Sequence, residues 1–186
     1  MKTNNSLLGF ALLGLLLEKP KSGYDLRKFF AATAMGSFSD SPGAIYPALD
    51  RLERQKLTRA TVETSTGLRK RRVFKVTARG LAAFKAWLRR PLTRDDLIHR
   101  GDELMLRFAF MDQTLGADQA TAFLREYARE LKGYIPSLKA YLDATSVNMP
   151  MSARLAFEFG VQEHEAGLKW ARTSIARYEQ RKGNQE

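Results

Sequence analysis

The chain has 186 residues, of which 44% are hydrophobic and 27% are charged, and it contains no cysteine. These proportions are typical of a globular protein, and the lack of cysteine excludes disulfides and thiolate chemistry and favours a reducing cytoplasm. Residues 1–92 hold 18 Lys and Arg against 6 Asp and Glu, and residues 93–186 hold 13 against 14, so the halves carry +12 and −1. Their sum is the net charge of +11. This separation indicates two domains, 1–92 and 93–186, of which the first meets a polyanion.

The first apolar run, from Leu7 to Leu17, predicts a buried helix. It is too short to span a bilayer, and Glu18, Lys19 and Pro20 follow it where a signal peptide would need small residues. An anionic membrane surface would call for a basic amphipathic helix, and the basic residues fall mainly elsewhere. We therefore expect no membrane partner.

The next two helices are predicted from capping signals. Ser22, with Asp25 three residues later, is typical of a capping box, and it opens a helix over 23–32. Ser41 can cap a third helix that runs to about Lys56, and Pro42 suits its first position. The chain thus begins with three helices in close succession.

A β-hairpin and a fourth helix follow. Residues 58–64 and 72–77 are rich in Thr, Val and Phe and predict two strands around a basic tip. Thr77 then caps a helix that ends before Pro91. Beyond Pro91 the pattern is helical, with breaks near 115–117 and 146–152. The predicted fold is mainly α with a small β-hairpin wing: a winged helix-turn-helix domain and a C-terminal helical dimerisation domain.

The third helix has one apolar face. At 100° per residue, Ile45, Ala48, Leu49 and Leu52 point inward. The residues that point away are Gly43, Ala44, Pro47, Asp50, Arg51 and Arg54, with Tyr46 at the margin. This small outward tip allows close approach to a DNA groove, so thymine methyl groups and DNA shape would share the readout. We expect Tyr46 to bind a phosphate, Asp50 to pair with Arg54, and Pro47 to tighten or bend the first turn.

The hairpin tip carries four consecutive cations, Arg69, Lys70, Arg71 and Arg72. On a protruding loop, such a run contacts phosphates or the minor groove and provides affinity more than sequence choice. A charge run can also be a solvated face, and the capped third helix beside it favours DNA.

Four segments carry a family resemblance: Leu12-Leu13-Gly14-Leu15-Leu16, Ser22-Gly23-Tyr24-Asp25-Leu26, Gly43-Ala44-Ile45-Tyr46-Pro47-Ala48-Leu49-Asp50-Arg51-Leu52 and Val76-Thr77-Ala78-Arg79-Gly80. They closely resemble the PadR family of bacterial transcriptional regulators, over about residues 7–90. The remainder is similar to the longer C-terminal helical domain of one branch of that family, with no comparably sharp motif.

The resemblance implies a homodimer, usually a repressor and often one released by a small molecule. It places DNA contact on Tyr24, on the helix that carries Tyr46 and Pro47, and on the wing. We predict a sequence-specific repressor with a roughly palindromic operator and an effector whose binding residues are unknown. The predicted DNA-binding residues are Tyr24, Ser41, Gly43, Ala44, Tyr46, Pro47, Arg51, Arg54, Arg69, Lys70, Arg71 and Arg72.

The second domain contains a heptad stripe, which marks a helix packed lengthwise on another. Its members are Phe157, Val161, His164, Leu168, Ala171, Ile175 and Tyr178. A comparable stripe precedes it, formed by Leu124, Ala128, Leu131, Ile135, Leu138 and Leu142. The two stripes can bury each other within one chain or between two. We favour a dimer interface between chains, because a two-fold dimer suits a bipartite operator.

Nothing in the sequence predicts catalysis. It has no phosphate loop, nucleophile elbow or paired catalytic carboxylates, and no second ligand accompanies His164 at metal-binding spacing. We predict a protein that is not an enzyme and uses no metal or cofactor. Two alternatives stay open: a sequence-indifferent architectural DNA-binding protein, which the cationic wing favours, and a small-molecule-binding protein on the same scaffold, for which only aromatic residues speak.

Overall fold

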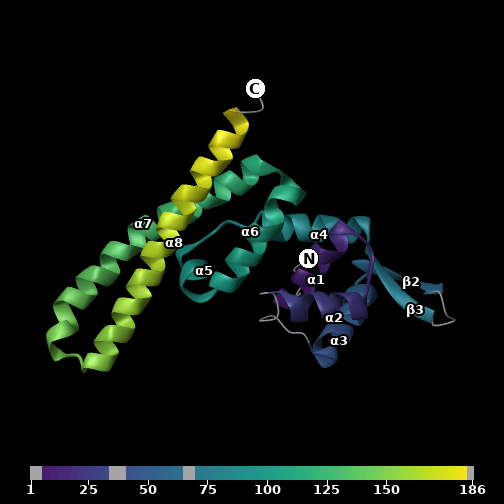
Figure 1. The fold of residues 1–186 in the computed structure, drawn as a ribbon, viewed down its shortest axis with the longest axis horizontal. Helices are drawn as coiled ribbons and strands as arrows, with labels where there is room; N and C mark the ends of the chain where they lie inside the picture. Colours follow the sequence, from purple (N-terminus) through teal and green to yellow (C-terminus); the bar gives the residue numbers. More distant parts are fainter. Residues whose placement is uncertain (1–5, 34–40, 65–69, 184–186) are drawn as a thin grey trace. The chain divides into compact units, whose positions relative to one another are not determined.

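The structure, a computed structural model of the chain, describes residues 6–33, 41–64 and 70–183. It divides into two compact units, Met1–Arg90 and Pro91–Glu186, which we call the head and the helical unit. The fold is mostly helical with one small antiparallel sheet, as the sequence predicts (Figure 1).

The head begins with three helices and ends with a ribbon and a fourth helix (Figure 1). Its elements are α1 (Leu7–Glu18), β1 (Lys21–Ser22), α2 (Gly23–Ala32), α3 (Pro42–Arg54), β2 (Thr58–Thr64), β3 (Lys70–Val76) and α4 (Ala78–Leu88). The predicted caps are confirmed: Ser22 and Asp25 form a capping box, and the side chains of Ser41 and Thr77 cap α3 and α4. Strand β1 is the element that the sequence analysis missed, because two residues carry no readable alternation.

Helix α1 forms the centre of the head's core. It is apolar on most sides, and its residues 9–16 are all buried. The indole of Trp87 on α4 stacks on the ring of Phe10, with the ring centroids 4.3 Å apart. Lys21 is also buried, and its Nζ donates to the carbonyl of Leu15 (2.8 Å) and to the carboxylate of Glu18 (2.9 Å). A cation therefore satisfies the last turn of α1, where carbonyls lack helical partners.

The three strands form an antiparallel sheet in the order β1-β3-β2. Ser22 of β1 is opposite Val73, and Thr61 of β2 is opposite the same residue from the other side. Strand β3 is thus the central strand, and it joins the start of α2 to the wing. The wing is the β2–β3 ribbon, which is drawn at one side of the head in Figure 1.

The junction between α3 and α4 depends on close backbone contacts. The Thr77 hydroxyl donates to the carbonyl of Lys56 (2.8 Å), and its oxygen accepts from the backbone N–H of Gly80 (3.0 Å). A Cβ on Gly80 would stand 2.0 Å from the carbonyl oxygen of Leu57, so no larger residue fits there. Lys56 has a φ of 60° and ends α3 in a left-handed conformation that favours glycine.

The helical unit contains α5 (Arg94–His99), α6 (Gly101–Leu115), α7 (Ala117–Thr145), the 3-10 helix η2 (Ser146–Asn148) and α8 (Met151–Gly183). The predicted breaks near 115–117 and 146–152 are confirmed. A third break, at Arg100, was not predicted, and it separates the short α5 from α6. Gly116, between α6 and α7, has a φ of 92°.

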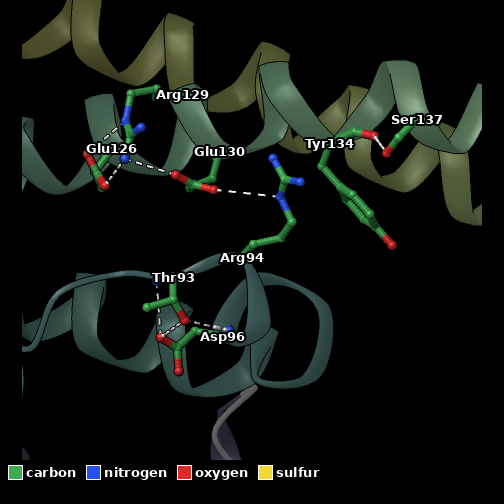
Figure 2. A network of polar contacts seen from close by, with 8 residues as sticks. All are labelled: Thr93, Arg94, Asp96, Glu126, Arg129, Glu130, Tyr134 and Ser137. Atoms are coloured by element: carbon green, nitrogen blue, oxygen red, sulfur yellow. Dashed lines mark hydrogen bonds and ion pairs between the residues drawn. The ribbon is translucent and has the colours of Figure 1, made fainter.

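Helix α5 is fastened to α7 by polar and apolar contacts. Thr93 and Asp96 form a capping box that starts α5, and Arg94 extends from α5 to the carboxylate of Glu130 on α7 at 3.9 Å (Figure 2). Leu97 is buried in one cluster with Leu131 and Ile135 of α7. Helix α5 is therefore held on α7 by an ion pair and by apolar packing.

The α8 stripe packs on α7 of the same chain, and the interchain pairing that we favoured from sequence stays a prediction. The ring of Phe157 stacks on Tyr141 with the centroids 5.4 Å apart, and His164 meets Tyr134 edge-on at 5.3 Å. Leu168 packs against the Leu131 cluster. Of the other stripe members, Val161 and Ala171 are buried, Ile175 is half-buried, and the Tyr178 hydroxyl donates to Asp112 of α6 (3.4 Å).

Proximity explains the packing within one chain. Helices α7 and α8 are joined by a short turn, so they lie side by side and antiparallel (Figure 1), and the complementary stripe of α7 reaches α8 before a second chain can. Periodicity shows which face is buried, and it does not show which chain covers that face.

Candidate nucleic-acid interface

Helix α3 exposes the face that the sequence analysis predicted. Ile45, Ala48, Leu49 and Leu52 are buried. Of the predicted outward residues, Gly43, Pro47, Asp50, Arg51 and Arg54 are exposed and Ala44 is half-buried. Ser41 caps the helix by accepting from the backbone N–H of Gly43 (3.2 Å). The exposed start of α3 is therefore small and uncharged, and its two arginines follow about two and three turns later.

Pro47 lies inside α3 without breaking it, since the helix runs unbroken from Pro42 to Arg54. The first turn includes a short-range bond in which the N–H of Ala44 donates to the carbonyl of Ser41 (3.1 Å). The N–H of Ile45 donates to the same carbonyl in the ordinary α-helical bond (3.1 Å), so the tightening of the first turn by Pro47 stays a prediction.

Tyr46 rests directly on Gly23 at the start of α2. A Cβ on Gly23 would stand 2.4 Å from Cε1 of Tyr46, so only glycine allows the ring to lie there. The Tyr46 side chain is still 44% exposed. Tyr24, the residue after Gly23 on α2, is 59% exposed. The glycine of the Ser-Gly-Tyr-Asp segment thus positions one tyrosine of the site, and the residue after it supplies a second.

These tyrosines and the wing line one cleft of about 510 Å³ in the head. Its lining residues are Ser22, Gly23, Tyr24, Asp25, Tyr46, Lys70, Arg71, Arg72 and Phe74. Five of the predicted DNA-binding residues therefore meet in one place: Tyr24, Tyr46, Lys70, Arg71 and Arg72. Two phenolic hydroxyls beside three cations form a surface that suits phosphate oxygens.

One carboxylate, that of Asp25, is among the residues that line the cleft, and Ser22 fixes its position by two hydrogen bonds. Asp25 accepts from the Ser22 hydroxyl (2.7 Å) and from the Ser22 backbone N–H (3.0 Å). The hydroxyl bond, with smaller attractions from Arg71 and Lys19, holds the pKa of Asp25 below its ordinary value of 3.8, against an opposing effect of partial burial. Asp25 therefore stays ionised, with its charge directed to the helix start.

The wing cations differ in their partners. Arg71 pairs with Glu63, which is directly opposite on the neighbouring strand, at 3.3 Å. Lys70 makes no ion pair with any residue that the structure describes. Arg69 lies outside the described residues. Two of the four predicted cations are therefore already engaged with carboxylates.

Asp50 does not pair with Arg54 as predicted. Its carboxylate accepts from Arg72 of β3 at 3.1 Å, and Arg72 also binds Glu53. Sequence spacing made the i, i+4 pair on α3 the natural choice, but the wing brings a third arginine to the same face. Glu53 is the site residue that the sequence analysis missed. Its signal was a second acid one turn after Asp50 on an otherwise basic surface.

Other kinds of site are not found in the described part of the chain. No group of three or more His, Asp or Glu residues there is arranged to hold a metal ion. None of the helices described is both long enough and apolar enough to cross a membrane.

Three helices, a cationic ribbon and a fourth helix, with a capped and exposed α3, define a winged helix-turn-helix protein. Residues 12–86 match the model of the transcriptional regulator PadR-like family. The head of this chain is therefore similar to the PadR-like family of transcriptional regulators over these residues.

The chain is also similar to solved structures. One is Bacillus subtilis PadR in complex with operator DNA, with 20% identity, 93% of this chain and 99% of that chain covered, and a TM-score of 0.44. Another is the PadR-like regulator BC1756 from Bacillus cereus, with 21% identity, coverage of 94% and 99%, and a TM-score of 0.41. A third is Bacillus subtilis PadR in complex with p-coumaric acid, with 20% identity, coverage of 96% and 99%, and a TM-score of 0.38. No curated protein matches the sequence.

Proposed function

We propose that the protein is a homodimeric, sequence-specific repressor that binds a roughly palindromic operator in the cytoplasm and is released by a small molecule. The observation that carries the DNA-binding part is the cleft of the head, where Tyr24, Tyr46, Lys70 and Arg71 gather beside the exposed start of α3. The start of α3 enters the major groove, and the cleft and the wing bind the flanking phosphates.

The start of α3 offers a sharp test because Gly43 has room for a methyl group in the free protein. A Cβ there would meet only the Ser41 hydroxyl oxygen at 3.5 Å, an ordinary contact. Gly43→Ala should leave thermal unfolding of the protein unchanged or slightly raised, since alanine favours helix. If this tip lies against base edges, the same methyl group should weaken operator binding severalfold. Unchanged affinity would remove α3 from the interface.

The operator itself can be found by selecting bound sequences from a random pool of duplexes. A dimer with two heads predicts two related half-sites about 34 Å apart along the duplex. The architectural alternative, which the cationic wing favours, predicts no enrichment and equal affinity for selected and random duplexes at one salt concentration. Pairing of Arg71 and Arg72 with carboxylates reduces the wing's free charge and weighs against that alternative.

For the homodimer, we propose the outer face of α8 as part of the interface. Met151, Leu155 and Phe159 are 69%, 56% and 61% exposed and recur every four residues, so they form an apolar stripe that α7 does not cover. Light scattering should report a dimer for the wild type and a shift toward monomer for Phe159→Glu. Ile98→Glu, an exposed apolar position on α5, is the matched control and should stay dimeric.

Release by an effector requires that the effector bind one state of the dimer better than the other. A ligand that binds the free protein should then weaken operator binding, and the operator should weaken ligand binding by the same factor. A ligand that binds equally with and without operator would instead support the small-molecule-binding alternative.

A further inference from the structure

Arg72 is the described wing cation whose hydrogen-bond partners lie outside the wing. Its Nη1 donates to Oδ1 of Asp50 at 3.1 Å, and its Nη2 donates to Oε2 of Glu53, so both partners lie on α3. The guanidinium also lies over the ring of Phe74, 5.1 Å from the centroid. Phe74 is buried in the core. Arg72 is therefore held by two carboxylates and supported by a fixed ring.

Glu53 extends this contact to the second strand of the wing. Its other carboxylate oxygen, Oε1, accepts from the backbone N–H of Ala60 on β2 at 3.1 Å. One carboxylate thus joins α3 to β2 directly and to β3 through Arg72. Since these bonds cross between elements, they define the angle at which the ribbon leaves α3.

The neighbouring cations have no such role. Arg71 pairs with Glu63 inside the ribbon, which leaves the ribbon free to turn as a unit. Lys70 pairs with no residue that the structure describes. Exchanging a surface partner for a phosphate is easy for either of them, because a lone exposed ion pair contributes little to stability.

Arg72 is different because it cannot leave its place without leaving two carboxylates unpaired. The group formed by Asp50, Glu53 and Arg72 carries a net charge of −1, so it offers a phosphate no net attraction. If Arg72 turned to the DNA, two carboxylates on α3 would face the backbone unpaired, at a position where like charges repel.

We propose that Arg72 is a positioning residue, which fixes the wing relative to α3 through Asp50 and Glu53, and that phosphate contact in the wing falls to Lys70 and Arg71. This inference rests on the proposed DNA-binding function, because the position of the wing matters only if the wing contacts DNA. The contacts of Arg72 themselves are those of the protein without DNA. It predicts that the wing and α3 reach the duplex together only while this guanidinium is in place.

The salt dependence of binding separates positioning from phosphate contact. Each lost phosphate contact lowers the slope of log affinity against log salt by about 0.9. Lys70→Gln and Arg71→Gln should each flatten the slope by that amount. Arg72→Gln should lower affinity about tenfold with the wild-type slope. A slope that Arg72→Gln flattens as much as Arg71→Gln does would overturn the proposal.

Two further variants use the same assay. Arg72→Lys retains the charge but not the forked geometry, so it should bind as poorly as Arg72→Gln. Glu53→Gln removes a negative charge near the DNA and should nevertheless weaken binding, with no added effect in the Arg72→Gln background. Restored binding by Arg72→Lys, or tighter binding by Glu53→Gln, would contradict a positioning role.

The geometry can be tested without DNA. Because the chain has no cysteine, cysteines introduced at Thr64 on β2 and Arg54 on α3 carry spin labels at unique positions. The distance distribution between the labels should be narrow with Arg72 and clearly broader with Arg72→Gln, while Arg71→Gln should leave it narrow. Equal widths of the distance distribution in all three proteins would overturn the proposal. Failure of the wild type to bind DNA is a separate outcome, and it would count against the proposed function alone.

Discussion

The head and the helical unit are stabilised by different kinds of contact. In the head, single atoms meet closely: Gly80 lies against the Leu57 carbonyl, and Gly23 lies under the Tyr46 ring. In the helical unit, α7 and α8 meet through side chains along their length, and no described atom of another element lies within 4 Å of where a Cβ of Gly160 would stand. The head therefore depends on individual residues, whereas the helical unit depends on a repeated pattern that tolerates local change.

The largest expected effect compares alanine at Gly80 and at Gly160. Gly80→Ala forces a methyl group against the backbone of Leu57 and should lower the free energy of unfolding by about 3 kcal/mol. Gly160→Ala fills open space in the middle of α8 and should raise it by about 0.5–1 kcal/mol. Urea unfolding followed by circular dichroism measures both. Similar losses of unfolding free energy at the two positions would contradict the difference between the head and the helical unit.

The next effect concerns function. Gly23→Ala must displace the Tyr46 ring, and we expect a loss of about tenfold in operator affinity, or about 1.4 kcal/mol. Gly167→Ala on α8 brings its methyl group to 3.1 Å from the Tyr127 hydroxyl, which a small shift of that side chain relieves. Its affinity should stay near the wild-type value. Fluorescence anisotropy with the selected duplex decides, and equal losses would show that the helical unit is as sensitive as the head.

At helix ends we expect the head and the helical unit to respond in the same way to a change of residue. Lys56→Gly relieves a left-handed residue in the head and should stabilise it by about 1 kcal/mol. Gly116→Ala places a side chain at φ 92° and ψ 163°, a region that essentially only glycine adopts, and should destabilise the helical unit by at least about 1 kcal/mol. The melting temperature should rise for Lys56→Gly and fall for Gly116→Ala, because in both units a residue with positive φ is most stable as glycine.

The smallest effect is a dependence on pH. The pKa of Asp25 is lowered mainly by the Ser22 hydroxyl, so its contribution to stability is complete above the ordinary value of 3.8 and is lost as the pH falls through the lower folded value. Asp25→Asn should flatten the acid side of the stability curve. Glu126→Gln in the helical unit is the control. The bond from Arg129 lowers the pKa of Glu126 too (Figure 2), but Glu126 is only half-buried and Arg129 is exposed, so that pair should matter less.

The sequence predicted most of the head because its signals are local. The caps at Ser22, Ser41 and Thr77 and the inward face of α3 depend on residues within one or two turns, and the structure confirms them. Strand β1 and the partners of Arg72 were missed because they join residues far apart in the chain, which no local pattern reports.

The helical unit shows the complementary limit. Its stripes correctly indicated two long helices with apolar faces, and the breaks between them were found. Which chain covers the α8 stripe depends on the length of the turn after α7, and a heptad pattern contains no information about that. The role of Gly23 was hidden for the same reason, since the ring that needs it comes from another helix.

The pairing of β1 with β3 has a consequence for how the cleft can move. β1 runs directly into α2, so the tyrosine wall and the cationic wall of the cleft share one sheet. The walls cannot separate by a hinge; widening requires that the backbone hydrogen bonds between β1 and β3 break first. Hydrogen exchange at the amides of the β1–β3 ladder should therefore be slow in the free protein and faster in any state that a ligand opens.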